Sequence, residues 1–222
     1  MAITTRTVPA ILTDNSSTLE KLVRQAETFT NYVQFDLMDG QFVPSRSYSV
    51  EDLVALKTTL SWETHLMMLQ PEGHLEKLQR AGAKKIVFHF EAVSSPEKII
   101  SLIKNLGVKI GLAVNPETPI NAFKALVPEV DSVLFMAVNP GYYGAKFIPE
   151  VLDKIKEFRK TFFKTETGID GGIKENNIVE VARSGVNVIY IGSAIFLQPE
   201  PAASYRRLDA MVQLATGKEN SK

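Results

Sequence analysis

Short hydrophobic runs rich in β-branched and aromatic residues recur along the chain, with longer amphipathic segments between them. We expect the runs to be eight strands, at residues 8–12, 32–37, 62–68, 85–90, 108–114, 132–138, 165–170 and 188–192. The segments between them carry helix-start signals, such as Ser49 ahead of residues 50–53 and Pro149 ahead of residues 150–160. Regular alternation of strand and helix predicts a parallel sheet.

The number and order of these units favour a closed barrel. An open, doubly wound sheet is the competing architecture, but no glycine-rich dinucleotide turn follows the first expected strand. Eight strand–helix units in 222 residues match the size of a (β/α)₈ TIM barrel. We therefore predict an α/β fold with one barrel domain over residues 1–215 and a polar tail at residues 216–222.

Composition narrows the classes of partner. Lys plus Arg and Asp plus Glu balance at 25 each, so no strong positive field points to nucleic acid or to an anionic membrane surface. The chain has no cysteine and no apolar run near the about 20 residues that cross a bilayer. We expect a cytoplasmic protein that binds a small molecule and possesses helix faces compatible with a homo-oligomer, although core packing explains those faces equally well.

In a TIM barrel the reacting groups lie at the carboxyl ends of the strands. Side chains alternate along a strand, so Gln34, Asp36 and Met38 share one face of the second strand, and His65 and Met67 share one face of the third. Asp170 ends the seventh strand, about half the barrel away from Asp36. The sequence therefore predicts two carboxylates that face each other across a pocket, with His65 between them; the alternative is that each aspartate only caps a loop.

Glycine-rich loops follow the sixth, seventh and eighth expected strands. Glycine lets the backbone approach an anion closely, and amides at the start of a helix donate to it. This pattern predicts a phosphate site; the alternative is that the glycines only shape tight turns. The candidate phosphate-binding residues are Gly141, Gly144, Gly171, Gly172, Gly192 and Ser193.

Six motifs resemble the ribulose-phosphate 3-epimerase family, in order and at the family's spacing. They are FDLMDGQFVPS, THLMMLQP, FHFEA, GLAVNPETPI, MAVNPGYYGAKFIPEVLDKI, and GIDGGIKENNI with IGSAIF, and the similarity runs from about residue 8 to about residue 197. The resemblance implies a barrel of the ribulose-phosphate-binding type. It also implies interconversion of ribulose 5-phosphate and xylulose 5-phosphate, a step of the pentose phosphate pathway, by proton removal at C3 and return to the opposite face.

The resemblance also implies roles for individual residues. Asp36 and Asp170 match the family's acid/base pair, and both match ligands of a divalent metal of the zinc, iron, manganese or cobalt class, together with His65 and a second histidine. His65 also matches a substrate-binding position. Met38, Met67 and Met136 match the floor of the family's pocket, although ordinary packing explains methionine there equally well.

The chemistry explains this layout. Inversion of a carbon through a planar enediolate needs a base on one face and an acid on the other. A metal between the two carboxylates would neutralise the charge that develops on the enediolate oxygens. His89, which ends the fourth expected strand, and His74, within a helix, are interpreted as a packed or hydrogen-bonded residue and a surface residue, respectively.

The chain departs from the family's pattern at three places. Gln34 stands where relatives have the first metal-ligand histidine, which predicts a weak or lost ligand. Ala10 replaces a serine that touches substrate, a loss for which Thr13 could partly compensate. In the loop after the sixth strand, Tyr143 replaces a glycine and Ala145 a glutamine, while Lys146 either restores charge or is simply solvated.

Three hypotheses are compatible with these differences. The chain is a ketopentose-phosphate epimerase with an altered or absent metal centre, in which case Gln34 donates its amide N–H to the enediolate. Alternatively, the same acid/base pair acts on another ketose phosphate. The third hypothesis is a non-catalytic sugar-phosphate-binding protein with a degenerate metal site.

Overall fold

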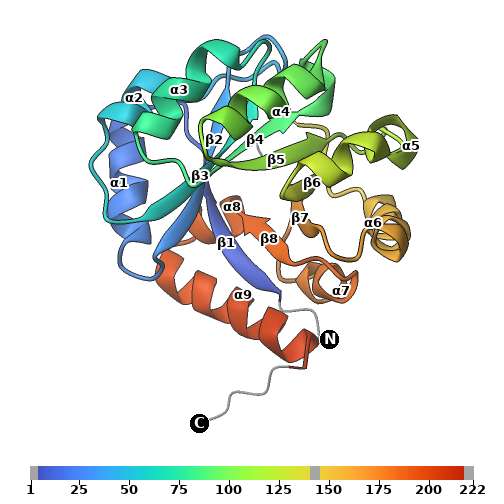
Figure 1. The fold of residues 1–222 in the computed structure, drawn as a ribbon. Coiled ribbons are helices and arrows are strands. Elements are labelled where there is room, and N and C mark those ends of the chain that lie inside the picture. The colour runs from blue at the N-terminus through green and yellow to red at the C-terminus, as the bar shows by residue number, and fades with distance from the viewer. Residues whose placement is uncertain (1–4, 141–145, 218–222) are drawn as a thin grey trace.

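The computed structural model describes residues 5–140 and 146–217, and within these ranges eight parallel strands close into a barrel in sequence order (Figure 1). The strands are β1 (Arg6–Ile11), β2 (Tyr32–Met38), β3 (Ser61–Met67), β4 (Lys85–His89), β5 (Lys109–Val114), β6 (Ser132–Met136), β7 (Glu166–Asp170) and β8 (Val188–Ile191). Each overlaps one of the eight expected runs. The predicted TIM barrel is therefore confirmed.

Helices surround the barrel on its outside (Figure 1). They are α1 (Ser16–Ala26), α2 (Val50–Ala55), α3 (Glu72–Arg80), α4 (Pro96–Asn105), α5 (Ile120–Phe123), α6 (Glu150–Thr161), α7 (Ile178–Arg183), α8 (Ser193–Phe196) and α9 (Pro201–Ala215), with short 3₁₀ helices at Phe90–Ala92 and Lys124–Glu129. No helix in the described part of the chain is both long and apolar enough to cross a membrane. Helix α9 ends at Ala215; the division of the chain there into a domain and a tail stays a prediction.

The helix-start signals act as the sequence predicts. Ser49 caps α2 in a capping box, since its hydroxyl accepts from the Asp52 amide and the Asp52 carboxylate accepts from the Ser49 amide. Helix α6 begins directly after Pro149. The segment between β5 and β6 is the irregular one: α5 has a single turn and continues as a 3₁₀ helix that contains Pro128, which cannot donate a helical hydrogen bond.

The core forms two layers, as the alternation of side chains in a barrel requires. Outward-facing residues such as Phe35, Phe88 and Phe135 pack in one large cluster between the strands and the helices. Inward-facing residues, among them Val87 and Leu134, fill the barrel itself. The interior is thus packed with side chains, and the pocket described below opens at its carboxyl end.

The lower interior of the barrel, on the side of the amino ends of the strands, contains buried polar and charged side chains that pair with one another. Lys85 Nζ lies 3.1 Å from a Glu63 carboxylate oxygen and 3.0 Å from one of Glu166. Tyr190 donates its hydroxyl to Glu63 at 2.5 Å, and Tyr32 donates to the same carboxylate at 2.7 Å. A buried charge is tolerated only when it is paired in this way. This Lys85–Glu63 network closes the barrel beneath the pocket described next.

Candidate active site

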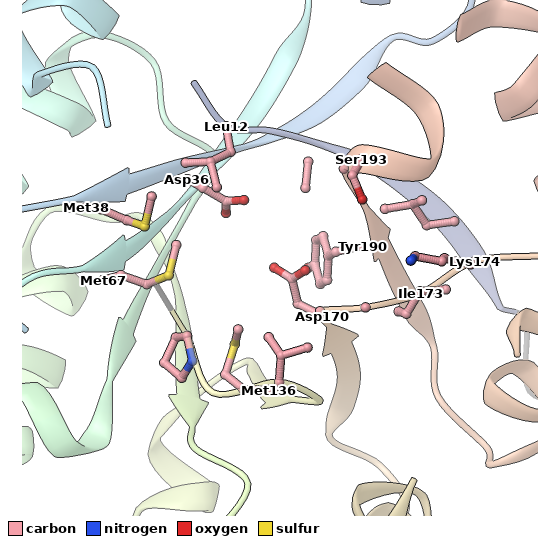
Figure 2. Close-up of a pocket in the computed structure, with 17 residues that line it drawn as sticks. Leu12, Asp36, Met38, Met67, Met136, Asp170, Ile173, Lys174, Tyr190 and Ser193 are labelled. Atoms are coloured by element: carbon pink, nitrogen blue, oxygen red, sulfur yellow. The ribbon is translucent and has the colours of Figure 1, made fainter. Parts of the chain in front are cut away.

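Two carboxylates point into a pocket at the carboxyl ends of the strands. Asp36 extends from β2 and Asp170 from β7, with three methionines beside them and Ser193 and Lys174 on the other side (Figure 2). The pocket is lined by Ala10, Leu12, Asp36, Met38, Met67, Met136, Val138, Pro140, Asp170, Gly171, Gly172, Ile173, Lys174, Tyr190, Ile191, Gly192 and Ser193. Met38, Met67 and Met136 thus line this pocket; that they form its floor stays a prediction.

Strand register explains how these side chains meet. Asp36 pairs with His65 and Met38 with Met67 between β2 and β3, so both pairs face the barrel interior at matching heights. Met136 on β6 pairs with Asp170 on β7. The register between neighbouring strands, together with each residue's position on its strand, therefore brings these side chains close to one another.

Gln34 precedes Asp36 by two positions on β2, His65 is the register partner of Asp36 on β3, and both side chains are fully buried. Gln34 donates from Nε2 to Asp36 Oδ1 at 2.9 Å and to Asp170 Oδ2 at 3.0 Å. His65 turns Nδ1 toward the same two oxygens, at 3.2 Å from Asp36 and 3.7 Å from Asp170. The structure therefore brings together all four residues predicted for the metal centre.

Burial dominates the electrostatics of the site. It raises the pKa of Asp36 from 3.8 to about 8, against the hydrogen bond from Gln34, which lowers it. It also raises the pKa of Asp170 to about 7, with a further increase from the nearby Asp36 charge. Burial lowers the pKa of His65, so the imidazole between them is neutral near pH 7. One or both carboxyl groups therefore hold a proton near neutral pH in the absence of a cation.

Asp36, His65 and Asp170 could hold a divalent metal ion. One ligand atom from each lies within 4.8 Å of the others, and two carboxylates with an imidazole suit such an ion. Gln34 does not complete this set as it stands, because its amide NH₂ faces the carboxylates. Its Oε1 is buried and finds no hydrogen-bond partner among the described residues, so only half a turn of the amide would direct an oxygen toward the ion.

On the side of the pocket away from the methionines, glycines leave the backbone exposed to the cavity. Gly171 and Gly172 follow β7 with φ of +107° and +66°, in the left-handed region that favours glycine. A Cβ at Gly172 would also lie 3.1 Å from the Phe147 backbone. Gly192 and Ser193 line the same side, whereas Gly141 and Gly144 lie outside the described residues.

The departures from the family's pattern fall in different places. Ala10 lines the pocket and pairs with Gln34 between β1 and β2. Thr13 is absent from the described lining of this pocket; it lines an adjoining pocket together with Ala10, and its hydroxyl accepts from the Asn15 amide at the start of α1. Lys146 is exposed and likewise absent from that lining. Tyr143 and Ala145 lie outside the described residues.

Three features were not anticipated from the sequence. Lys174, in the loop between β7 and α7, lines the pocket on the same side as Ser193, although nothing in its sequence context marks it as a site residue. His89 is hydrogen-bonded, as predicted, but its partner is His65, with 2.9 Å between the two Nε2 atoms. Glu91 in turn lies 3.3 Å from His89 Nδ1. The motif FHFEA contains both residues, and that spacing was the available signal. His74 is partly buried in α3, away from the pocket.

Fold and pocket together define a TIM barrel with a site built at the carboxyl ends of its strands. The chain belongs to the ribulose-phosphate 3-epimerase family, whose model matches residues 6–196.

Individual relatives agree with this assignment. The chain is 37% identical over 205 residues to a ribulose-phosphate 3-epimerase of Synechocystis sp., covering 87% of this chain and 88% of the relative. It is 36% identical over 200 residues to the one of Escherichia coli, covering 86% and 89%. Among solved structures, 3-hexulose-6-phosphate synthase from Salmonella typhimurium superposes with a TM-score of 0.70 over 95% of this chain and 99% of that one, and at 15% identity it supports the fold alone.

Proposed function

We propose that the chain is a ribulose-phosphate 3-epimerase, an isomerase that interconverts D-ribulose 5-phosphate and D-xylulose 5-phosphate. The observation that carries the proposal is the pair of buried carboxylates, Asp36 and Asp170, that enter one pocket from strands on different sides of the barrel. Membership of the ribulose-phosphate 3-epimerase family also supports the proposal.

The two aspartates are the proton carriers in this proposal. With C3 of the substrate between them, one carboxylate removes the proton from one face, and the other, as a neutral acid, returns a proton to the opposite face. The pKa values of about 8 and about 7 match this task, because a group that titrates near the working pH both gives and takes a proton readily. Their roles exchange in the reverse reaction.

Asp36, His65 and Asp170 would hold a divalent cation of the zinc, iron, manganese or cobalt class in this enzyme. When bound, such an ion would supply positive charge that stabilises negative charge on the substrate's oxygens. Gln34 makes the affinity lower than an imidazole would, since it offers at best an amide oxygen. Independently of the ion, its Nε2 donates to both carboxylates and holds them in place.

The glycine-rich side of the pocket is proposed to take the phosphate. Backbone at Gly171, Gly172 and Gly192 leaves room for a close approach, and Ser193 adds a hydroxyl. Lys174 supplies positive charge on the same side. The methionines form the opposite, apolar side, where polarizable thioethers contact the sugar without competing for its hydroxyl groups.

One observation favours a second candidate substrate. Ala10 removes a hydroxyl from the pocket next to Gln34, so the two departures from the family adjoin each other across β1 and β2. A paired change at one wall of the pocket is what a different ketose phosphate would select.

We also propose a cytoplasmic location, in keeping with the absence of cysteine, and assembly as a homo-oligomer.

The test follows hydrogen exchange at C3. The purified chain is incubated with ribulose 5-phosphate in deuterated water, with and without chelator and with added zinc, manganese or cobalt. We expect deuterium at C3 and formation of xylulose 5-phosphate, faster with metal. Absence of both under every metal condition would overturn the epimerase proposal; exchange with another ketose phosphate alone would support the second candidate, and tight binding without exchange would indicate a non-catalytic protein.

A further inference from the structure

A line of hydrogen-bonding groups runs from the carboxylates to the edge of the barrel. His65 presents Nδ1 to Asp36 and Asp170, and its Nε2 lies 2.9 Å from Nε2 of His89. His89 Nδ1 lies 3.3 Å from Glu91 Oε2. Both rings are fully buried, and they stack with their centroids 5.0 Å apart. Every ring nitrogen thus has a defined polar neighbour, and His65 Nδ1 has two.

Glu91 ends this line as a fixed acceptor. Its other oxygen, Oε1, accepts from the backbone N–H of Asn115 at 2.8 Å and from the hydroxyl of Thr118. Both neighbours of Oε1 are donors, so they hold Glu91 as a carboxylate with Oε2 directed at His89.

The donor and acceptor roles along the line follow from this end. A carboxylate oxygen accepts, so His89 Nδ1 carries the proton. A neutral His89 then offers a lone pair at Nε2, and His65 donates its Nε2–H to it. His65 Nδ1 is left without a proton, and its lone pair faces Asp36 and Asp170. That lone pair is what a cation held by these three residues needs.

We propose that His89 and Glu91 are positioning residues that fix the tautomer of His65, so that its Nδ1 lone pair faces the Asp36 and Asp170 carboxylates ready for a metal ion. The inference rests on the metal centre of the proposed function and deepens it. His89 and Glu91 touch neither the substrate nor the ion; they act through His65. Phe42 packs at a tilt against the ring of His89, with centroids 4.8 Å apart, and so holds the intermediate ring in place.

Glu91→Gln is the informative variant. The Asn115 backbone N–H keeps the amide oxygen of the new side chain, because a buried backbone donor must be satisfied. The NH₂ group then points at His89 Nδ1 and donates to it. Every hydrogen bond along the line reverses, and His65 ends with its proton on Nδ1, where it blocks a metal ion.

The first measurement is nitrogen NMR of the metal-free chain labelled with ¹⁵N-histidine. The sequence has three histidines, so the spectrum is simple, and His74→Gln together with His89→Gln assigns it. We expect His65 to be protonated at Nε2 in the unaltered chain and at Nδ1 in the Glu91→Gln variant. A proton on Nδ1 of His65 in the unaltered metal-free chain would overturn the proposal.

The second measurement is metal affinity, by competition with a chromophoric chelator for zinc or manganese. We expect Glu91→Gln to weaken binding by about 10- to 100-fold, the usual effect of losing a partner that orients a ligand. Glu117→Gln is the matched control, since it removes an equal charge from an exposed position near His89. Equal affinities for both variants, or no metal binding by the unaltered chain, would overturn the proposal.

His89→Gln guards against a variant that fails to fold. A glutamine there accepts from His65 Nε2 through its amide oxygen and is expected to retain more affinity than His89→Phe, which removes the acceptor. Identical affinity for these two variants would also contradict the proposal. Neither measurement uses a sugar phosphate, so a failed epimerase assay leaves both results interpretable.

Discussion

Gln34 and Asp170 are 136 positions apart in the sequence, and a hydrogen bond of 3.0 Å from Gln34 Nε2 to Asp170 Oδ2 joins them across the barrel. The same nitrogen donates to Asp36, so one amide group bridges the two carboxylates. An NH₂ group here partly offsets the repulsion that two adjacent carboxylates would otherwise feel. Gln34, which stands where the family's pattern has a histidine, therefore supports the two carboxylates through its own hydrogen bonds.

Replacement of this bridge tests the metal centre directly. In Gln34→His an imidazole would face Asp36 and Asp170 in place of the amide, and we expect affinity for zinc or cobalt to rise by about tenfold or more. Metal content of the purified variant, measured by mass spectrometry against the unaltered chain, checks this. Gln34→Leu serves as the control that removes both bridging and ligation; similar metal content in the histidine and leucine variants would contradict the prediction.

Removal of either Asp36 or Asp170 should leave proton exchange at only one face of C3. In Asp36→Asn and in Asp170→Asn we expect epimerisation to fall by about 10²- to 10⁴-fold, because one face of C3 loses its acid or base. Each variant is expected to exchange deuterium into only one of the two epimers, and the favoured epimer should differ between them. Loss of exchange from the same epimer in both variants would argue against opposed bases.

The stability of the metal-free chain should fall as the pH rises above neutrality. The pKa of Asp36 is about 8 and that of Asp170 about 7 in the folded chain, both raised from 3.8 by burial. The folded chain therefore keeps protons that the unfolded chain releases, so this contribution is complete below pH 3.8 and is lost as the pH rises through 7 and 8. Burial lowers the pKa of His89 to about 4, and its opposite effect acts only below about pH 6.5.

Thermal unfolding between pH 6.5 and 9 measures this loss. We expect the melting temperature of the chelated chain to decrease over that range. A saturating divalent cation, which binds the ionised carboxylates, should flatten the decrease. Asp36→Asn is the control that removes one of the titrating groups; the same slope in that variant would show that other groups cause it.

Lys174 should matter for binding more than for chemistry. Its amine lies on the glycine-rich side of the pocket, away from the methionines (Figure 2). In Lys174→Met we expect KM for ribulose 5-phosphate to increase by about tenfold while kcat changes less, since an interaction with the phosphate is kept throughout the reaction. Lys146→Met loses the same charge from an exposed position and is expected to leave KM unchanged. Equal effects of the two changes would indicate a general charge effect.

The network at the base of the barrel should be a strong stability determinant. Lys85→Met leaves the buried Glu63 carboxylate without its cation and is expected to destabilise the fold by about 3–5 kcal/mol. Addition of Glu63→Gln removes the stranded charge and should restore part of that loss. Urea unfolding of both variants, with the exposed Lys109→Met as control, checks the order. A double variant less stable than Lys85→Met would contradict it.

The fold could be predicted from the sequence because the pattern that marks each strand lies within a few consecutive residues. Runs such as residues 32–37 predict β2 within one residue, since their apolar residues stand out from the polar loops on either side and alternate with Gln34 and Asp36. The same alternation places Asp36 inward. The irregular segment around Pro128 is less predictable, because a single turn of α-helix and a 3₁₀ turn have similar sequence patterns.

The partnerships within the site were only partly predictable. Alternation and order bring Asp36, His65 and Asp170 to one layer, but they do not show which atoms of Gln34 face the carboxylates. That orientation depends on hydrogen bonds across the barrel. His89 was expected to be packed or hydrogen-bonded; its contact with His65 depends on the distance and tilt between β3 and β4, which no sequence pattern encodes.

The ion pair of Lys85 and Glu63 stabilises the barrel at a different level from the residues that line the pocket. Lys85 and Glu63 hold the lower interior together through bonds that involve none of Gln34, Asp36 or Asp170. A substitution at Gln34 or Ala10 therefore removes none of the hydrogen bonds and ion pairs of this network. A histidine at position 34, or a serine at position 10, would alter the metal and substrate contacts of the pocket while the ion pairs of the lower interior keep their partners.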